Sequence, residues 1–232
     1  MAPVPIDRLL VAALRADPSG PFLTFYDDAT GERVELSLTS LENWVAKTAN
    51  LLVDELDLEP GEPVLVDLPA HWQTAVIWLG VALAGGHVVE GRNVEAGVVE
   101  GGVVESDAGS ARIAFFAEGA AQPAADELVG LGLRPLGGGL RMPRRGVLDY
   151  AREVPTHGDR FAAVAAAVVE TGEPIPDRLL TPSLEPLLAV LAGSGSLVLC
   201  RNPDLTALTD RASTERATAT WGLDLPGLPR RG

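Results

Sequence analysis

Hydrophobic positions between residues 39 and 60 recur at intervals that predict a long amphipathic helix. Thr39 and Glu42 have the spacing of a capping box, in which each side chain satisfies a backbone N–H of the first helical turn. Apolar residues then recur at steps of three and four, which places them on one helical face. The pattern predicts a helix that starts near Thr39 and ends before Pro60 and Gly61, a pair that turns the chain.

A strand, a helix and a second strand are predicted after this turn. Residues 63–68 are β-branched and aliphatic, as in a buried strand, and residues 71–84 form an almost wholly apolar helical stretch. Two glycines end that helix before a short apolar run at residues 87–89. Strand, helix and strand in so few residues predict a parallel pair with a right-handed crossover. One core should contain Leu41, Trp44, Val45, Leu51, Leu52, Val64, Val66, Val76, Ile77, Leu79, Val81 and Val88.

Shorter patterns predict the remaining elements. A helix at 6–14 should precede a hairpin of strands at 22–26 and 33–37. The later predicted elements are a strand at 111–117, a brief helix at 147–153, a buried helix at 161–170, a helix at 186–193, a strand at 196–200, a helix at 205–216 and a strand at 217–221. Residues 124–133 fit a helix, a strand or one followed by the other. Val-Val-Glu occurs at 88–90, 98–100 and 103–105, which we interpret as strand or extended loop. We expect one compact α/β domain over residues 1–232, with a weak division near residue 150 and a frayed tail at 222–232.

A succession of motifs carries a resemblance to a known family. Residues 58–64 read L-E-P-G-E-P-V after the amphipathic helix, Leu-Pro follows at 68–69, and the apolar helix ends in Ala82, Ala84 and Gly85. A weaker match is P-L-L-A-V-L-A-G at 186–193 followed by S-L-V-L. This order resembles the N-terminal part of the adenylate-forming superfamily, which includes acyl-CoA synthetases, luciferases and peptide-synthetase adenylation domains. The chain also resembles short, uncharacterised actinobacterial proteins of this type.

The resemblance covers about half of the chain and implies a mixed, mostly parallel sheet flanked by helices. It also identifies what the sequence lacks. The superfamily holds ATP with a loop rich in Ser, Thr and Gly that ends in Pro-Lys, and no segment here matches it. Lys47 is the only lysine and lies on the amphipathic helix, so no catalytic lysine is carried over. The later Y-G-x-T-E and T-G-D signatures are also missing.

A second departure concerns the acyl substrate. In the superfamily, the segment before the P-L-L-A helix commonly contains an aromatic residue or histidine that lines the acyl tunnel. Residues 181–185 occupy that place here and contain neither. Pro182 biases Thr181 toward an extended backbone and leaves Ser183 as the expected cap of the next helix. Because positioning and charge stabilisation are both large parts of catalysis, we do not expect this chain alone to form acyl-adenylates.

Charge and composition exclude several classes of function. Lys and Arg total 18 against 32 Asp and Glu, which gives a net charge of −14 and a field that repels nucleic acid. The most apolar run, residues 75–84, is about half of the ~20 residues that cross a bilayer. The N-terminus does not resemble a secretory signal, and Cys200 is the single cysteine. We expect a cytoplasmic protein with no disulfide, no membrane span and no nucleic-acid partner.

One basic, glycine-rich island stands out in this acidic chain. It contains Arg134, Gly137, Gly138, Gly139, Arg141, Arg144 and Arg145. Flexible backbone beside guanidinium groups can hold a phosphate or carboxylate, so the island is a candidate anion-binding site. The alternative is a mobile surface loop, which the lack of a fixed strand-to-helix context favours.

The remaining polar residues predict no catalytic or metal site. Three isolated histidines, at 71, 87 and 157, lack zinc-ligand spacing, and glutamates at 90, 95, 100 and 105 do not converge on any regular element. His157 and Asp159 could orient a serine, but no G-x-S-x-G elbow is present. Cys200 and the helical tryptophans at 44, 72 and 78 fit core positions. We expect a non-catalytic binding or regulatory module without a cofactor, with an acyl or nucleotide ligand, a protein partner or a second copy as candidates. The alternative is an enzyme completed by a partner chain or using unrelated chemistry.

Overall fold

The computed structural model describes residues 3–91 and 111–232, which form an α/β fold with two five-stranded sheets. The helices are α1 (Ile6–Ala16), α2 (Leu38–Asp54), α3 (Trp72–Leu83), η2 (Pro135–Gly137), α4 (Tyr150–Glu153), η3 (Val154–Thr156), α5 (Leu187–Ala192) and α6 (Leu208–Thr214). The strands are β1 (Val4–Pro5), β2 (Pro21–Asp27), β3 (Glu32–Ser37), β4 (Pro63–Asp67), β5 (His87–Glu90), β6 (Ile113–Ala117), β7 (Glu127–Leu131), β8 (Val147–Asp149), β9 (Val168–Val169), β10 (Arg178–Thr181), β11 (Ser196–Arg201) and β12 (Ala219–Thr220).

One sheet is parallel throughout, with the order β5-β4-β6-β7-β8. The predicted strand, helix and strand are its β4, α3 and β5, and β4 and β5 pair in parallel as expected. The segment left open between helix and strand is the strand β7. We call this sheet the parallel sheet.

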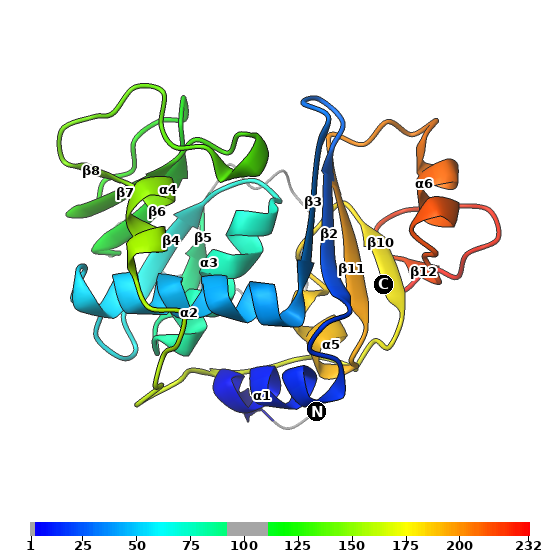
Figure 1. The fold of residues 1–232 in the computed structure, drawn as a ribbon, viewed down its shortest axis with the longest axis horizontal. Helices are drawn as coiled ribbons and strands as arrows, with labels where there is room; N and C mark the ends of the chain where they lie inside the picture. Colours follow the sequence, from blue (N-terminus) through cyan, green and yellow to red (C-terminus); the bar gives the residue numbers. More distant parts are fainter. Residues whose placement is uncertain (1–2, 92–110) are drawn as a thin grey trace.

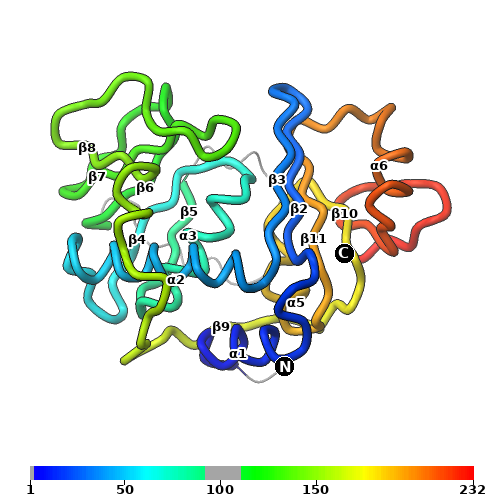
Figure 2. Tube along the Cα trace, in the orientation of Figure 1, coloured from blue at the N-terminus to red at the C-terminus, as the bar shows by residue number. Residues whose placement is uncertain are grey.

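The other sheet, which we call the mixed sheet, has the order β12-β10-β11-β2-β3. Its β2–β3 pair is the predicted antiparallel hairpin, and the other neighbours are parallel. After β1 and α1, the chain forms β2 and β3 of this sheet, passes through the parallel sheet and returns with β10. Segments from both parts of the sequence therefore lie side by side (Figures 1 and 2). The mostly parallel α/β class is confirmed, although the strands divide between two sheets.

Helices α2 and α3 pack against each other and join the two sheets, and α1 lies beneath them (Figure 1). One buried cluster contains side chains from both sheets and from all three helices. Ten of the twelve predicted core residues are buried in this cluster, while Trp44 and Val88 pack against it partly exposed. The periodicity of the sequence therefore identified the core correctly.

The start of α2 differs from the predicted capping box. The helix begins at Leu38, and its cap is Ser37, whose hydroxyl accepts from the Ser40 backbone N–H at 3.1 Å. The Thr39 hydroxyl instead donates to the Pro18 carbonyl oxygen at 2.8 Å. Ser37 and Thr39 both carry a hydroxyl group near the start of α2. Ser37 is the cap because the end of β3 places it in the extended conformation that a cap needs.

The predicted buried helix at residues 161–170 is wrong. This segment is extended, its Val164 side chain is 99% exposed, and it contains the short strand β9, which pairs with β1. The Ala167 N–H donates to the Ala82 carbonyl at the end of α3, and the Ala167 carbonyl accepts from the Ile6 N–H. Tertiary partners satisfy these backbone groups, so an alanine-rich composition did not produce a helix.

Two smaller predictions also need correction. The brief helix at 147–153 is the strand β8 followed by one helical turn, α4, capped by Asp149. The tail after residue 221, expected to fray, is held at the sheet edge, where the Thr220 N–H donates to the Pro229 carbonyl and the Arg231 N–H donates to the Thr220 carbonyl. The second and third Val-Val-Glu copies, with Glu95, Glu100 and Glu105, lie outside the described residues. Across residues 3–91 and 111–232, no helix is long and apolar enough to span a membrane.

Candidate functional site

A cavity of about 610 Å³ lies where the carboxyl ends of strands from both sheets meet. The ends of β4, β5 and β6 approach it from the parallel sheet, and the segments after β10 and β11 approach it from the mixed sheet. Ligands of open α/β sheets commonly bind in crevices outside the carboxyl ends of the strands. We call this space the inter-sheet cavity and treat it as the candidate site.

Among the described residues, three carboxylates and one guanidinium line the inter-sheet cavity: Asp67, Glu90, Glu185 and Arg201. The Glu185 Oε2 accepts from the Trp221 indole N–H at 3.1 Å, which holds that carboxylate in place. Desolvation at the cavity wall raises the pKa of Glu90, and the negative charge of Glu185 raises it further. Among the described residues, carboxylates therefore outnumber guanidinium groups on the cavity wall.

A smaller cavity of about 230 Å³ lies beside α3 and β5. Trp78 and Glu90 line both this space and the inter-sheet cavity, so the two cavities are neighbours. The walls of the smaller space are mainly apolar and include Leu79, Ala82 and Leu187. We call this space the apolar annex. The two neighbouring spaces thus differ in polarity, one being polar and the other apolar.

The segment that precedes α5 lines the inter-sheet cavity. Pro182, Ser183, Leu184 and Glu185 are all on its wall. Ser183 does not cap α5, which starts at Leu187. Its hydroxyl instead accepts from the Glu185 N–H at 3.1 Å, while the Thr181 hydroxyl accepts from the Ser183 N–H at 3.0 Å. These bonds fix the turn that presents Glu185 to the cavity.

Local sequence patterns do not identify the four charged residues of the cavity, Asp67, Glu90, Glu185 and Arg201, as a group. Each follows or ends a strand or a strand-like run, which is a signal for the carboxyl edge of a parallel sheet. Which strand ends face one another depends on strand order, and strand order is not visible in local periodicity. The sequence indicates that these residues lie at strand ends, but only the arrangement of the two sheets shows that the strand ends meet at one cavity.

The basic island forms a loop whose backbone N–H groups already bind carboxylates of the chain. The N–H groups of Arg141 and Met142 both donate to Glu118 Oε1, at 2.8 and 3.0 Å. The Leu140 N–H donates to Asp149 Oδ2 at 3.0 Å, and the Leu136 N–H donates to Glu32 at 3.3 Å. Because of these hydrogen bonds, fewer backbone N–H groups of the island are available to bind a phosphate.

The island's own arginines are distributed unevenly over this loop. Arg141, Arg144 and Arg145 are exposed, whereas Arg134 is half-buried. Gly137 has a φ of +66° and lies beside the Trp72 ring, so this glycine is needed for the course of the loop. Gly138 and Gly139 approach Gly132 through their carbonyl oxygens. Anion binding by the island stays a prediction. The guanidinium groups of its arginines would have to supply the contacts to the anion.

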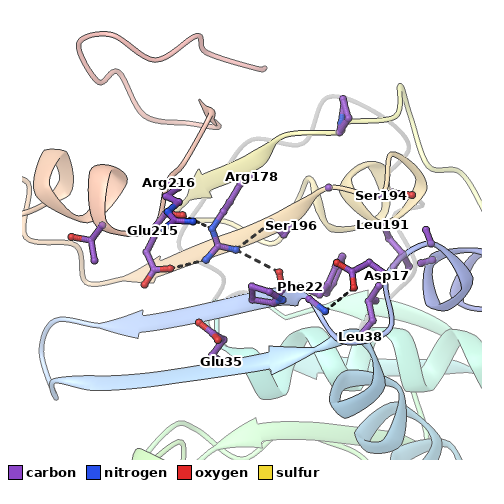
Figure 3. Close-up of a pocket in the computed structure, with 17 residues that line it drawn as sticks. Asp17, Phe22, Glu35, Leu38, Arg178, Leu191, Ser194, Ser196, Glu215 and Arg216 are labelled. Atoms are coloured by element: carbon purple, nitrogen blue, oxygen red, sulfur yellow. Dashed lines mark hydrogen bonds and ion pairs between the residues drawn. The ribbon is translucent and has the colours of Figure 1, made fainter.

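A third cavity, of about 480 Å³, lies at the amino ends of the strands of the mixed sheet (Figure 3). Its central cation is Arg178, whose Nη2 donates to Glu215 Oε2 at 2.6 Å and to Thr24 at 3.0 Å. Nη1 donates to Ser196 and to the Pro21 carbonyl, and Nε donates to the Glu215 carbonyl. All five guanidinium N–H groups are thus engaged within the chain, so Arg178 holds strands together here and has no donor left for a ligand.

His71 and Glu32 form a buried polar contact between the sheets. Their side chains are 0% and 2% exposed, and His71 Nε2 lies 3.6 Å from a Glu32 oxygen. The Nδ1 atom accepts from the Gln73 N–H and so caps α3. Burial lowers the pKa of His71 although Glu32 opposes that effect, which favours a neutral imidazole. His71 therefore organises the fold and does not face either cavity.

The other residues considered in the sequence, Cys200, Lys47 and His157, make contacts within the fold. Cys200 is fully buried and borders the inter-sheet cavity, and burial raises the pKa of its thiol, which disfavours the reactive thiolate. The Lys47 Nζ donates to the His157 carbonyl at 2.5 Å, and the His157 imidazole lies 3.4 Å from Glu55. Over the described part of the chain, no three His, Cys, Asp or Glu side chains are grouped as metal ligands would be.

Comparison with known proteins assigns the chain to a family. No family model matches the sequence. A curated protein of Mycobacterium tuberculosis, described as a TIGR03089 family protein, is 36% identical over 237 residues, covering 90% of this chain and 95% of the relative. The chain belongs to the TIGR03089 family. At this identity and coverage, the two chains share one fold along nearly their whole length.

Solved structures resemble this member of the family in fold. Acetoacetyl-CoA synthetase from Streptomyces lividans matches with a TM-score of 0.68 at 17% identity, over 95% of this chain and 42% of that one. The anthranilate CoA ligase AuaEII, solved with anthranoyl-AMP, matches with a TM-score of 0.67 at 12% identity, over 95% of this chain and 50% of that one. The N-terminal domain of FACL13 from Mycobacterium tuberculosis matches with a TM-score of 0.66 at 13% identity, over 94% of this chain and 62% of that one. The chain thus spans about half the length of these structures, and its expected likeness to the N-terminal part of adenylate-forming enzymes is confirmed for the fold.

Proposed function

We propose that this acyl-CoA-synthetase-like chain is a ligand-binding module that does not form acyl-adenylates, and that the inter-sheet cavity with its apolar annex holds the ligand. The observation that carries the proposal is a pair of neighbouring cavities, the larger of which lies at the carboxyl ends of strands from both sheets. A polar space beside an apolar one suits a small amphiphile. The segment at residues 182–185, expected beside a substrate, lies on the same wall.

The chemistry of the cavity supports binding without adenylation. Transfer to a nucleotide phosphate needs cations placed where negative charge develops. Among the described residues, the lining has three carboxylates and one guanidinium, that of Arg201, and no segment of the sequence matches the phosphate loop. Its one lysine, Lys47 on α2, donates a hydrogen bond to the His157 carbonyl and does not line the cavity. These features are consistent with a module that binds a ligand and thereby regulates a partner protein.

ATP–pyrophosphate exchange tests the absence of adenylation. We expect no exchange above a heat-killed control with short, medium and long fatty acids, aryl acids or amino acids. Native mass spectrometry of the purified protein should reveal a retained small molecule. Exchange that persists after repurification and in Lys47→Ala would contradict the proposal and indicate an ATP site elsewhere in the chain.

A second candidate function is an enzyme component that a partner chain completes. The observation in its favour is that the chain spans only about half of the adenylate-forming structures it resembles. A partner could then supply the phosphate loop and the catalytic lysine. Co-purification from the native organism followed by exchange assays distinguishes the two, because only the completed enzyme would consume ATP.

A further inference from the structure

The chain at residues 160–170, which we call the 160–170 segment, carries apolar side chains between one charge at each end. It passes below α2 and reaches β9 beside α1 (Figure 2). Residues 161–169 are uncharged, and Arg160 and Glu170 flank them. Both flanking side chains are exposed. The segment therefore presents an apolar surface with a cation at one end and an anion at the other.

The outward face of this segment is held in place by the fold. Its exposed side chains are all apolar: Ala162, Val164, Ala165 and Val168. Val164 is 99% exposed and Val168 is 61% exposed, although hydrogen bonds of the Ala167 backbone to Ala82 and Ile6 fix the chain between β9 and the core. Large apolar side chains that are fixed in water gain free energy when a second surface covers them.

The two terminal charges make this surface complementary to itself. A two-fold axis near Ala165 would place Arg160 opposite Glu170 of the partner subunit, and the same symmetry forms the reciprocal pair. Neither side chain forms an ion pair within the described part of the chain, although Glu42 lies near Arg160. Two chains of net charge −14 repel each other at a distance, so copies associate best through a surface whose own charges balance.

We propose that the 160–170 segment is an interface between two copies of this chain, packed antiparallel about a two-fold axis. The outward valines cover one another at its centre, and Arg160 pairs with Glu170 of the partner subunit at both ends. Interfaces below about 1,200 Å² give weak association, so a contact built on one segment forms a dimer only at raised concentration. Val168 also lines the apolar annex, which places the second copy beside the proposed ligand cavity.

Sedimentation velocity of the full chain measures this association. We expect a monomer at about 1 µM and an increasing share of dimer toward about 300 µM, the range in which a weak interface becomes populated. A protein that stays monomeric over the whole range would overturn the inference.

Charge reversal tests the antiparallel arrangement. Arg160→Glu and Glu170→Arg each place like charges opposite each other at both ends, so each variant alone should dimerise about tenfold more weakly or worse. An equimolar mixture of the two variants should associate again, because all opposed charges then differ in sign. Unchanged dimerisation of the folded single variants, or a mixture that stays monomeric, would overturn the inference.

Folding of these variants is checked by urea denaturation, because Glu42 and Asp159 lie close to the position of Arg160. If Arg160→Glu does not fold, Glu170→Arg alone is compared with the parent. Its dimerisation should still be about tenfold weaker. A folded Glu170→Arg protein that dimerises like the parent would overturn the inference.

Substitutions at Val164 test the apolar centre of the interface. Val164→Lys should abolish the dimer, whereas Leu205→Lys, which adds the same charge at a side chain 71% exposed outside the segment, should leave it unchanged. A short bis-maleimide should link two copies of Val164→Cys, near the axis, far faster than two copies of Leu205→Cys, since the natural Cys200 is buried. Equal loss of dimer in both lysine variants, or equal cross-linking of both cysteine variants, would overturn the inference.

Discussion

The Nζ of Lys47 donates a hydrogen bond to the carbonyl oxygen of His157 at 2.5 Å, joining α2 to the segment that follows η3. One helical turn further along α2, the Asn50 amide donates to the carbonyls of Gly158 and Arg160 at 2.8 and 3.0 Å. The chain's one lysine therefore anchors an extended segment to the central helix. A residue type that is catalytic in adenylate-forming enzymes has a structural partner here.

We predict that Lys47→Ala lowers the free energy of unfolding by about 1–3 kcal/mol, the range for losing a hydrogen bond to a charged group. Urea denaturation followed by tryptophan fluorescence measures the change. Asn50→Ala should be destabilising in the same direction, because it frees the same segment. A Lys47→Ala protein of unchanged stability that has lost ligand binding would contradict this structural role.

Truncation of the core face of α2 should cost much more. Leu52 is fully buried in the cluster that runs through both sheets, so Leu52→Ala should reduce the free energy of unfolding by about 2–5 kcal/mol, through lost transfer energy and a residual cavity. Leu205→Ala, at a side chain 71% exposed, is the control and should change little. An unchanged urea midpoint for Leu52→Ala would mean that the helix register is wrong.

The same measurement tests whether the chain is one domain. Because one buried cluster contains residues of both sheets, we predict a single cooperative transition in which circular dichroism and fluorescence coincide. Leu52→Ala should shift the whole curve. Two separated transitions would place a domain boundary between the sheets.

Acid should weaken the cluster around Glu215. Burial raises the pKa of this carboxyl, but hydrogen bonds from Tyr26, Arg178 and Arg33 outweigh burial and hold it below its ordinary value. A carboxyl with a lowered pKa in the folded state stabilises the fold above its unfolded pKa of about 4.3, and this contribution is lost as the pH falls through the folded value. Stability should therefore decrease from pH 5 downward.

Glu215→Gln removes this pH-dependent contribution. At pH 7 the variant should be less stable by about 1–3 kcal/mol, and its stability should change less between pH 5 and pH 3 than that of the parent. Glu35→Gln is the matched control, because Glu35 is 42% exposed and its ion pair with Arg33 is a surface contact worth about 0–1 kcal/mol. Parallel pH curves for Glu215→Gln and the parent would refute the assignment.

Anion binding by the basic island is tested by ligand-induced stabilisation. If Arg141, Arg144 and Arg145 hold a phosphate, millimolar ATP or CoA should raise the melting temperature of the parent by mass action, and replacing all three with alanine should abolish the shift. Arg15→Ala, an exposed arginine on α1, is the control. No shift in the parent would leave the island as a surface loop whose amides bind Glu118 and Asp149.

The sequence by itself determined the local elements whose periodicity is strong. The helix at Leu38–Asp54, the strand, helix and strand from Pro63 to Glu90, and the hairpin β2–β3 were all predicted, because their apolar spacing reports one buried face. The sequence alone also shows that no segment matches the phosphate loop, because that loop is recognised by its residue types. Where periodicity was weak, the prediction for residues 161–170 was wrong, since long-range backbone partners decided that conformation.

Only the tertiary structure decided the candidate site. Glu90 and Glu185 are far apart in the sequence, and they line one cavity because β5 ends in the parallel sheet beside the turn that follows β10 of the mixed sheet. The pairing of β11 with β2, which closes the mixed sheet, joins the two ends of the chain. Hydrophobic periodicity records which face of an element is buried but not which element covers it, so strand order, and with it the cavity, depends on packing across the whole chain.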